Sequence, residues 1–383
     1  MGPPKTVRTI SQEAFDEVVK ENVEDLGMDP AEALEDAIQT LTLQGVDLSG
    51  IVKCVPGESS VKDNPLIQSL DVLKQLDNNS KDQFSDKDLN ELFGLFDKLV
   101  ELFHDVQSTE TFRRIGGPTV LVNILKDGFE DLEILNSGFA VVAASAAGNE
   151  VVKESYMELK IDELILEILN RQRNDNIQSL YDAIRALLTP DDNRVVASQV
   201  YGYARRFAKI GIARALVRSV HAGLNSPSLI SASIALKAVV VNDEICKSIA
   251  ESGGIDAVLQ CIDDSAEQGN KTVARTCCSL LSKLAGSDSN KSSIVEKGGM
   301  DRLIKFSARF SDDASVLQEV MSIITVLSLR SPENAAFRNP ENRTLLLSNG
   351  IEKLIRQAKE NHESCKDAAT DALRDLGLDD YNK

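Results

Sequence analysis

Aromatic residues make up only 4% of the chain, and tryptophan is absent. A hydrophobic core must therefore be built from Leu, Ile, Val and Ala, which suit the close packing of helices. The hydrophobic content of 42% is ordinary for a folded protein. The chain has no run of about 18 apolar residues and no apolar signal segment at its start. We therefore expect no contact with a membrane.

Signatures of catalysis and of metal binding are also missing. None of the six cysteines forms a C-x-x-C pair. A phosphate-binding loop, a nucleophile elbow and an H-E-x-x-H motif are all absent. The histidines, His104, His221 and His362, lie far apart in the sequence. We expect no enzymatic activity, no metal and no cofactor, in a reducing compartment that is cytoplasmic, nuclear or both.

The adjacent cysteines Cys277 and Cys278 have two interpretations. We expect them to be two thiols in the core of a helix, and the alternative is a redox switch.

Five segments of the chain resemble one another. Each contains one or two glycines followed by an apolar helix start, and they occupy residues 115–122, 210–217, 253–259, 298–304 and 349–355. A degenerate copy around Lys160 and Ile161 falls in the middle of the widest gap. A period of roughly 40–47 residues is typical of helical repeat arrays. Such arrays usually present surfaces to partners.

Each repeat is expected to contain three helices. A polar first helix ends at the glycine, where a left-handed residue lets the second helix leave at a steep angle. A longer third helix follows after a short polar turn. The third helices are predicted at residues 134–147, 177–188, 229–241, 273–285 and 316–329, and a terminal helix at 363–376.

The N-terminal part differs from the repeats in charge. Residues 1–110 contain 23 Asp and Glu against 9 Lys and Arg, so that most of the net charge of −18 lies there. An acidic protein is a poor ligand for nucleic acid, and we expect no direct binding to it. The predicted boundaries are a disordered start at 1–9, a helical pair at 10–52, a linker at 53–65, a helical lead-in at 66–104, five or six repeats at 105–377 and a tail at 378–383.

The glycine-led helix starts, the period and the segment Ser-Lys-Leu-Ala-Gly-Ser-Asp-Ser-Asn-Lys at 282–291 resemble armadillo repeats. Three segments resemble the armadillo-repeat-containing protein 6 family: Ile10 through Asp25, the sequence Gly45-Val-Asp-Leu-Ser-Gly-Ile-Val-Lys, and the tail Ala368-Ala-Thr-Asp-Ala-Leu-Arg-Asp-Leu-Gly. The resemblance implies an all-α fold, a right-handed armadillo-type α-solenoid with a helical acidic N-terminal region.

The resemblance also implies where a partner binds. In armadillo proteins the third helices line a groove that holds extended peptides, and nuclear-import receptors carry a ladder of Trp and Asn there. This chain has no Trp, which argues against a receptor for basic nuclear-localisation peptides. The register of the third helices places five residues on or near the groove: Asp182, Lys237, Ser279, Lys283 and Thr325. The alternative is that these are ordinary solvated positions.

Residues 193–242 contain no Asp or Glu. We call their cations the basic band: Arg194, Arg205, Arg206, Lys209, Arg214, Arg218 and Lys237. Such a band would attract an acidic peptide or a phosphate group. The alternative is that these cations pair with acids on neighbouring helices or with the acidic N-terminal region. Tyr201, Tyr203 and Phe207 lie in the same stretch. We expect them to be buried, and the alternative is that they are exposed beside the arginines as a binding hot spot.

Taken together, the patterns favour a non-catalytic adaptor or scaffold. An extended or acidic segment of a partner protein would lie on the groove near the basic band, and we expect the chain to be monomeric. Two alternatives stay open, which are a transport or chaperone factor that escorts one client protein and, less favoured, a regulatory subunit of an enzyme.

Overall fold

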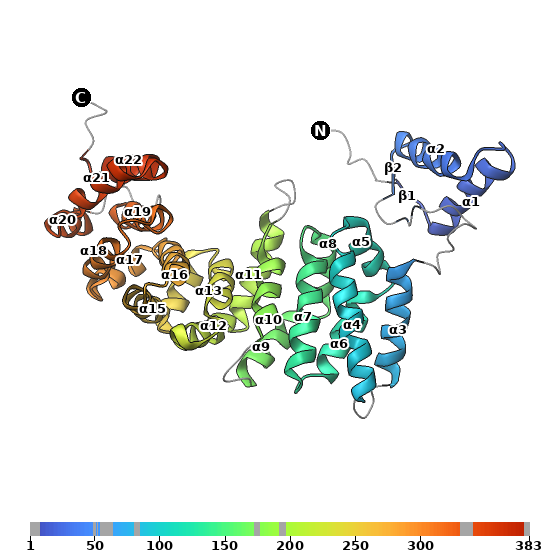
Figure 1. The fold of residues 1–383 in the computed structure, drawn as a ribbon, viewed down its shortest axis with the longest axis horizontal. Coiled ribbons are helices and arrows are strands. Elements are labelled where there is room, and N and C mark those ends of the chain that lie inside the picture. Colours follow the sequence, from blue (N-terminus) through green and yellow to red (C-terminus); the bar gives the residue numbers. More distant parts are fainter. Residues whose placement is uncertain are drawn as a thin grey trace. The chain divides into compact units, whose positions relative to one another are not determined.

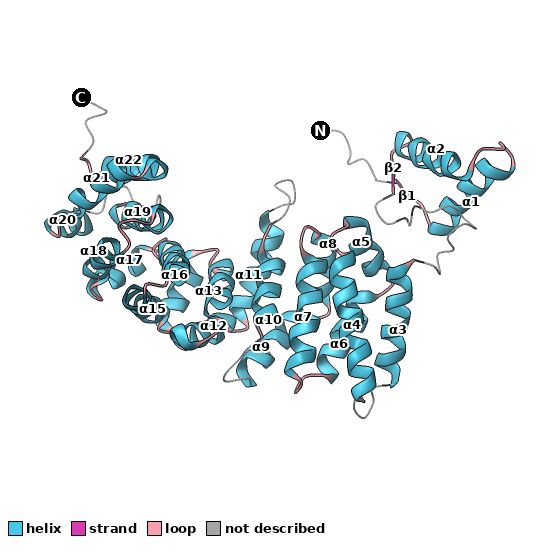
Figure 2. Cartoon of the chain, viewed as in Figure 1, coloured by secondary structure: helices cyan, strands magenta, loops and turns pink. Residues whose placement is uncertain are grey.

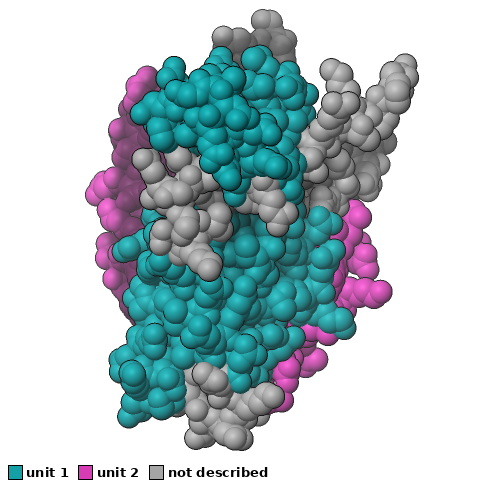
Figure 3. All heavy atoms as spheres, turned by 90° about the vertical axis from the view of Figure 1, so that its right-hand side faces the viewer, with its two compact units in different colours: residues 1–161, 190–195 teal, residues 162–189, 196–383 magenta. Residues whose placement is uncertain are grey.

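The structure is a computed structural model that describes residues 8–48, 51, 53, 64–79, 85–171, 177–190, 197–329 and 340–378. The described residues are overwhelmingly helical (Figure 2). They divide into two compact units, residues 1–161 with 190–195 and residues 162–189 with 196–383, coloured separately in Figure 3. Each unit is described by itself below.

The first unit begins with a small element that has its own core. It consists of β1 (Arg8–Thr9), α1 (Gln12–Glu24), α2 (Pro30–Leu43) and β2 (Val46–Asp47), with β1 and β2 paired in parallel. Ser11 caps α1, and Asp29 caps α2 with Pro30 at its first position. Phe15, Val19, Ala33, Ala37 and Leu41 form the core between the two helices. The strand pair was not predicted, because a strand of two residues is too short to show an alternation of apolar and polar side chains.

The remainder of the first unit is a helical stack. It contains α3 (Pro65–Asn79), α4 (Asp86–Leu102), α5 (Val106–Arg114), α6 (Gly117–Asp127), α7 (Leu132–Ala146) and α8 (Glu150–Glu158). Helix α3 packs against α6, and α4 packs against α7. The pair α3–α4 therefore occupies the positions of a second and a third helix ahead of the first complete repeat.

The second unit is also built from stacked helices. It begins with α9 (Ile161–Arg171) and α10 (Gln178–Leu188), followed by the repeats α11 (Ala197–Lys209), α12 (Ile212–His221), α13 (Leu229–Val239); α14 (Asp243–Glu251), α15 (Gly254–Gln268), α16 (Lys271–Leu284); α17 (Asp288–Glu296), α18 (Gly299–Arg309), α19 (Ala314–Ser328); and α20 (Pro340–Ser348), α21 (Ile351–Asn361), α22 (Lys366–Asp375). Short 3₁₀ turns lie at Gly223–Asn225 and Glu363–Cys365.

The second unit is layered by helix type. The third helices α10, α13, α16, α19 and α22 contact one another in that order, and the second helices α12, α15, α18 and α21 do the same (Figure 1). All the predicted third helices are present within a few residues of their predicted ends. No helix in the described ranges is both long enough and apolar enough to cross a membrane.

The predicted left-handed glycine is present at five of the junctions between first and second helices. Gly116, Gly211, Gly253, Gly298 and Gly350 have φ values of 84°, 95°, 87°, 73° and 81°. In the glycine pairs, the second glycine meets a different requirement. A Cβ on Gly117 would lie 2.2 Å from the Phe112 ring, so the two helices can approach only if that residue has no side chain. In the degenerate copy, Lys160 adopts the left-handed conformation itself, with φ 60°.

Polar side chains of the first helices close the ends of the third helices. Asn290 donates to the carbonyl of Leu284 at 3.0 Å, and Lys291 donates to the carbonyl of Leu329 at 2.7 Å. The next repeat repeats this arrangement, since Asn342 donates to Leu327 and Arg343 to Leu376. The last carbonyls of a helix have no partner within the helix, so these side chains satisfy acceptors that would otherwise be buried unpaired.

Replacing Gly211 by alanine tests the left-handed junction. The space around Gly211 is open, so the substitution should act through φ alone and lower the free energy of unfolding by about 1–2 kcal/mol. Gly202 is the matched control, because it lies in open space inside α11 with ordinary helical φ. Gly202→Ala should stabilise the protein by about 0.5–1 kcal/mol. Urea midpoints of the two variants that move in the same direction would contradict the assignment.

Asp313, the N-cap of α19, gives the fold a dependence on pH. Hydrogen bonds from Ser315 and Val316 and the ammonium of Lys271 lower the pKa of Asp313 to about 2, against a weaker opposing effect of burial. A lowered pKa means that the ionised form stabilises the folded state above the ordinary value of 3.8 and that this contribution is lost as the pH falls toward about 2.

Asp313→Asn retains a capping oxygen but removes the charge. At neutral pH the variant should be less stable by a few tenths to about 1 kcal/mol, since the pair with Lys271 is screened by solvent. The difference between the urea midpoints of variant and wild type should shrink on acidification, and a difference that grows would contradict the sign.

Candidate functional site

The second unit carries a pocket on the face formed by its third helices. The pocket has a volume of about 850 Å³, and its lining comes from α13, α16 and α19 together with the starts of α14 and α17. We call it the third-helix pocket and define it by the polar residues that the third helices contribute: Lys237, Ser279, Ser282, Lys283, Glu319 and Ser322.

The repeat register brings these side chains together. Ser228, Asn270 and Asp313 are the N-cap residues of α13, α16 and α19. Equivalent third-helix positions are therefore 42 and then 43 residues apart, which are the separations between Lys237, Ser279 and Ser322. The Nζ atom of Lys237 donates to Oγ of Ser279 at 2.5 Å, and the hydroxyls of Ser282 and Ser322 lie 3.0 Å apart.

Ion pairs neutralise the acids at the rim of the pocket. Asp243 pairs with Lys247 at 2.7 Å, and hydrogen bonds from Lys247 and Ser287 lower the pKa of Asp243. Asp288 pairs with the buried Lys291 at 2.9 Å.

On the third helices, by contrast, Lys237, Lys283 and Glu319 have no oppositely charged side chain within 4.0 Å among the described residues. The two lysines are exposed, so their charge is available to a ligand.

Three of the five predicted groove residues, Lys237, Ser279 and Lys283, line the pocket, while Asp182 and Thr325 do not. Thr325 is half-buried on α19, where its carbonyl accepts a hydrogen bond from Ser328. Asp182 lies on α10, where burial raises its pKa although Arg185, at 4.0 Å, acts in the opposite direction. The role of all five in binding stays a prediction.

The sequence analysis did not select Ser282, Glu319 and Ser322. Ser322 lies 43 residues after Ser279, whereas Ser279 lies 42 residues after Lys237, so a fixed repeat length would not have identified Ser322.

The basic band is divided by the structure. Arg206 forms an ion pair with Asp162, at N–O distances of 2.6 and 2.7 Å, and the Asp162 side chain is completely buried. Arg218 donates to the side-chain oxygen of Asn170 at 2.5 Å. For Arg206, pairing with an acid on a neighbouring helix is therefore the observed arrangement. Arg194 lies outside the described residues.

Three cations of the band, Arg205, Lys209 and Arg214, are exposed, and no carboxylate within the described ranges lies within 4.0 Å of them. They belong to α11 and α12, which are a first and a second helix. The third-helix pocket therefore contains only one member of the band, Lys237. Phe207 is buried as expected and Tyr203 is half-buried, whereas the side chain of Tyr201 lies outside the described part.

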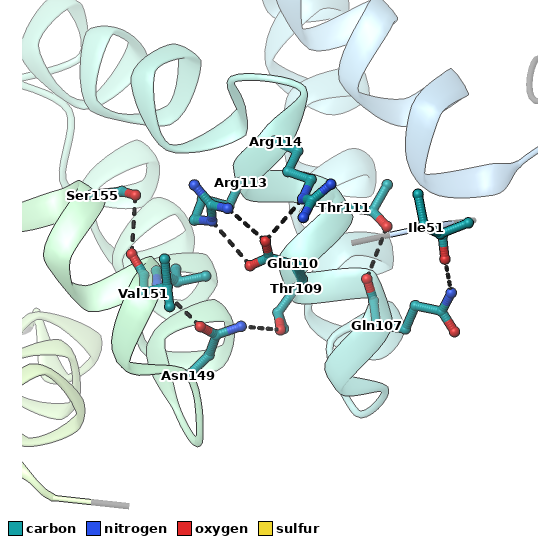
Figure 4. Close-up of polar contacts among 11 residues, drawn as sticks. Ile51, Gln107, Thr109, Glu110, Thr111, Arg113, Arg114, Asn149, Val151 and Ser155 are labelled. Atoms are coloured by element: carbon teal, nitrogen blue, oxygen red, sulfur yellow. Dashed lines mark hydrogen bonds and ion pairs between the residues drawn. The ribbon is translucent and has the colours of Figure 1, made fainter. Parts of the chain in front are cut away.

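In the first unit, polar side chains of α5 bond to one another and to the N-cap residue of α8 (Figure 4). Glu110 accepts hydrogen bonds from Arg113 at 2.5 and 3.0 Å and from Arg114 at 3.0 Å, while Asn149 donates to Thr109. Burial opposes the ionisation of Glu110, but the two arginines outweigh it and lower its pKa. Because Glu110 already binds both guanidinium groups, we interpret these contacts as structural and not as a binding site.

Among the remaining reactive side chains, the thiols of Cys261 and Cys277 contact each other, whereas His221 and His362 contact different parts of the second unit. Cys277 and Cys278 are fully buried, as expected for core thiols, and burial raises the pKa of Cys278. His362 contacts the carbonyl of Ser311 at 2.7 Å, and His221 lies beside Gly253. Within the described ranges, no group of three or more His, Cys, Asp and Glu residues could hold a metal ion.

Comparison with known proteins agrees with this architecture. A model of the armadillo repeat-containing protein 6 N-terminal domain matches residues 7–83. The Drosophila melanogaster homologue of armadillo repeat-containing protein 6 is 23% identical over 369 residues, covering 86% of this chain and 79% of the homologue. The human protein is also 23% identical, with 86% and 75% covered. The chain resembles armadillo repeat-containing protein 6.

Solved structures confirm the armadillo-type solenoid. An engineered protein covers 95% of this chain and 79% of its own length with a TM-score of 0.64 at 16% identity. A designed armadillo repeat protein in complex with the peptide (KR)4 covers 68% of this chain and 98% of its own length, with a TM-score of 0.55 at 16% identity. At this level of identity the likeness concerns the fold alone.

Arg206→Ala tests whether that arginine is structural. The substitution leaves the buried carboxylate of Asp162 without its partner and should lower the free energy of unfolding by about 1–3 kcal/mol. The neighbouring exposed Arg205 is the control, and Arg205→Ala should change stability by no more than about 0.5 kcal/mol. Equal urea midpoints for the two variants would show that the ion pair does not stabilise the fold.

Proposed function

We propose that this protein is a non-catalytic interaction scaffold whose third-helix pocket holds an extended, acidic segment of a partner protein. The observation that carries the proposal is the pair of lysines on successive third helices. Lys237 and Lys283 are exposed, line one pocket and lack an acidic partner among the described residues. Opposite charges on a ligand would be attracted to them and would fix its register.

The armadillo-type fold supports a binding role, and the charge of the pocket indicates the kind of segment. The designed armadillo repeat protein of similar fold binds (KR)4, a strongly basic peptide. The third-helix pocket of this chain has lysine where a basic ligand would need acids, so it is suited to a ligand of the opposite charge. Exposed hydroxyls next to these lysines offer further hydrogen bonds to an extended main chain.

The escort of a single client protein is a narrower form of the same proposal. A scaffold has several partners that compete for one surface, whereas an escort has one partner in equal amounts. We further propose that the protein acts as a monomer in the cytoplasm, the nucleus or both.

Charge reversal at the two lysines tests the proposal. Binding of a fluorescein-labelled alternating Glu-Gly peptide would be measured by anisotropy for wild type and for Lys237→Glu/Lys283→Glu. We expect roughly a tenfold loss of affinity or more, because each charge-assisted contact is worth about 1–3 kcal/mol. An alternating Lys-Gly peptide should bind the wild type far more weakly.

The control variant is Lys305→Glu/Lys353→Glu. These lysines are also exposed, but they lie on the second helices α18 and α21 and give the same change in net charge. A loss of affinity as large as that of the pocket variant would show that net charge, and not the pocket, governs binding. Undetectable binding of the acidic peptide to wild type would overturn the proposal.

The exposed cations of the basic band provide a second comparison. Arg205→Glu/Lys209→Glu/Arg214→Glu leaves the Arg206–Asp162 pair intact, so it alters charge without breaking the fold. If this variant loses affinity for the acidic peptide while the pocket variant retains it, the binding surface lies on α11 and α12.

A further inference from the structure

We infer that the third-helix pocket recognises a phosphorylated serine or threonine in the partner's extended segment, in preference to a glutamate or aspartate. The inference rests on the proposed function, since it names the chemical group that anchors the acidic segment. It is argued from the hydrogen-bond donors that converge in the pocket.

The first step is the number of donors left over after the internal hydrogen bonds are made. Lys237 has three N–H donors and uses one on Ser279. Because Ser279 accepts that bond, its own hydroxyl proton is available to a ligand. Ser282 and Ser322 bond to each other, and in such a pair one hydroxyl donates while the other retains its proton. Lys283 adds three more N–H donors.

The second step is geometry. Ser279, Ser282 and Lys283 stand at positions i, i+3 and i+4 of α16, so their side chains share one face of that helix. Lys237 reaches this face from α13 and Ser322 reaches it from α19. The donors of three consecutive repeats therefore converge on the lining of a single pocket.

The third step compares this donor set with possible anions. A carboxylate carries one charge and two oxygens, whereas a phosphate monoester carries a charge of about −1.5 to −2 and three terminal oxygens. Two ammonium groups together with two available hydroxyls match the larger charge and the larger number of acceptors. Displacing the neutral Ser279 oxygen from Lys237 by a phosphate oxygen also replaces a neutral acceptor with a charged one, which strengthens the bond.

Glu319 determines where in the pocket the phosphate lies. It stands one turn from Ser322 on α19 and has no cationic partner among the described residues. Its carboxylate repels a dianion from the α19 side and therefore favours a position between Lys237 and Lys283. Removing this charge should relax the restriction and strengthen binding.

The test uses three peptides that differ only at a central residue within an alternating Glu-Gly sequence, namely serine, glutamate or phosphoserine. Anisotropy with the full-length wild-type protein should show the phosphoserine peptide binding roughly tenfold or more tightly than the serine peptide, and more tightly than the glutamate peptide. Glu319→Gln should further increase the affinity for the phosphoserine peptide.

Ser282→Ala/Ser322→Ala should lower the affinity for the phosphoserine peptide by a larger factor than the affinity for the glutamate peptide, so that the ratio of the two affinities falls. The matched control is Ser252→Ala/Ser292→Ala. Ser252 is half-buried and Ser292 is exposed, both at first helices, where their hydroxyls donate to the carbonyls of Ser248 and Asp288. The control should retain the wild-type preference.

Two results would overturn the inference. If phosphoserine binds no better than glutamate in wild type, the pocket senses only charge; the proposed function then stands and the inference fails. If a single-stranded oligonucleotide displaces the phosphoserine peptide as effectively as unlabelled phosphopeptide does, the pocket does not distinguish a phosphopeptide from a nucleic acid. Failure of all three peptides to bind would instead contradict the proposed function itself.

Discussion

The left-handed residue between the first and second helices sets the geometry of each repeat. With φ near 80°, the chain turns out of the first helix and enters the second after only two intervening residues, so the two helices pack closely. A side chain with a Cβ resists this conformation, which explains why glycine recurs there. Where a second glycine follows, close contact with residues such as Phe112 imposes its own constraint. The junction therefore also influences where the third helix lies, and with it the register of the face that the third helices form.

The third-helix pocket is a consequence of that register. In α13, α16 and α19, equivalent positions recur after 42 and then 43 residues, so side chains that are remote in sequence line up on one face. Lys237, Ser279 and Ser322 occupy equivalent positions of these helices, with a lysine in α13 and a serine in α16 and in α19. A repeat array can thus assemble a recognition surface by changing one residue in each repeat, while the core residues that surround it remain apolar.

Much of the fold could be predicted from the sequence because its signals are local. The glycines mark the junctions, and apolar spacing marks the third helices, whose ends fall within a few residues of the prediction. The strand pair at Arg8–Thr9 and Val46–Asp47 was missed because two residues cannot display an alternating pattern. The partner of Arg206 could not be predicted, since Asp162 is 44 positions away and looks like any other helical acid in the sequence. Likewise, the contact between Ser282 and Ser322 depends on a register that varies between repeats.

The polar side chains that bond to the C-terminal carbonyls of the third helices also bear on what happens when the chain is cut between repeats. Asn290 reaches backward to the repeat before it, whereas Lys291 holds the third helix of its own repeat. A fragment that ends after α16 would leave the Leu284 carbonyl without its asparagine and would uncover the face of α16 that α19 covers. A fragment that begins at α17 would leave the Asn290 amide without its acceptors and would uncover the same interface from the other side. In this part of the second unit, a cut between two repeats therefore leaves neither piece with all of its partners, and the repeats are not independent modules.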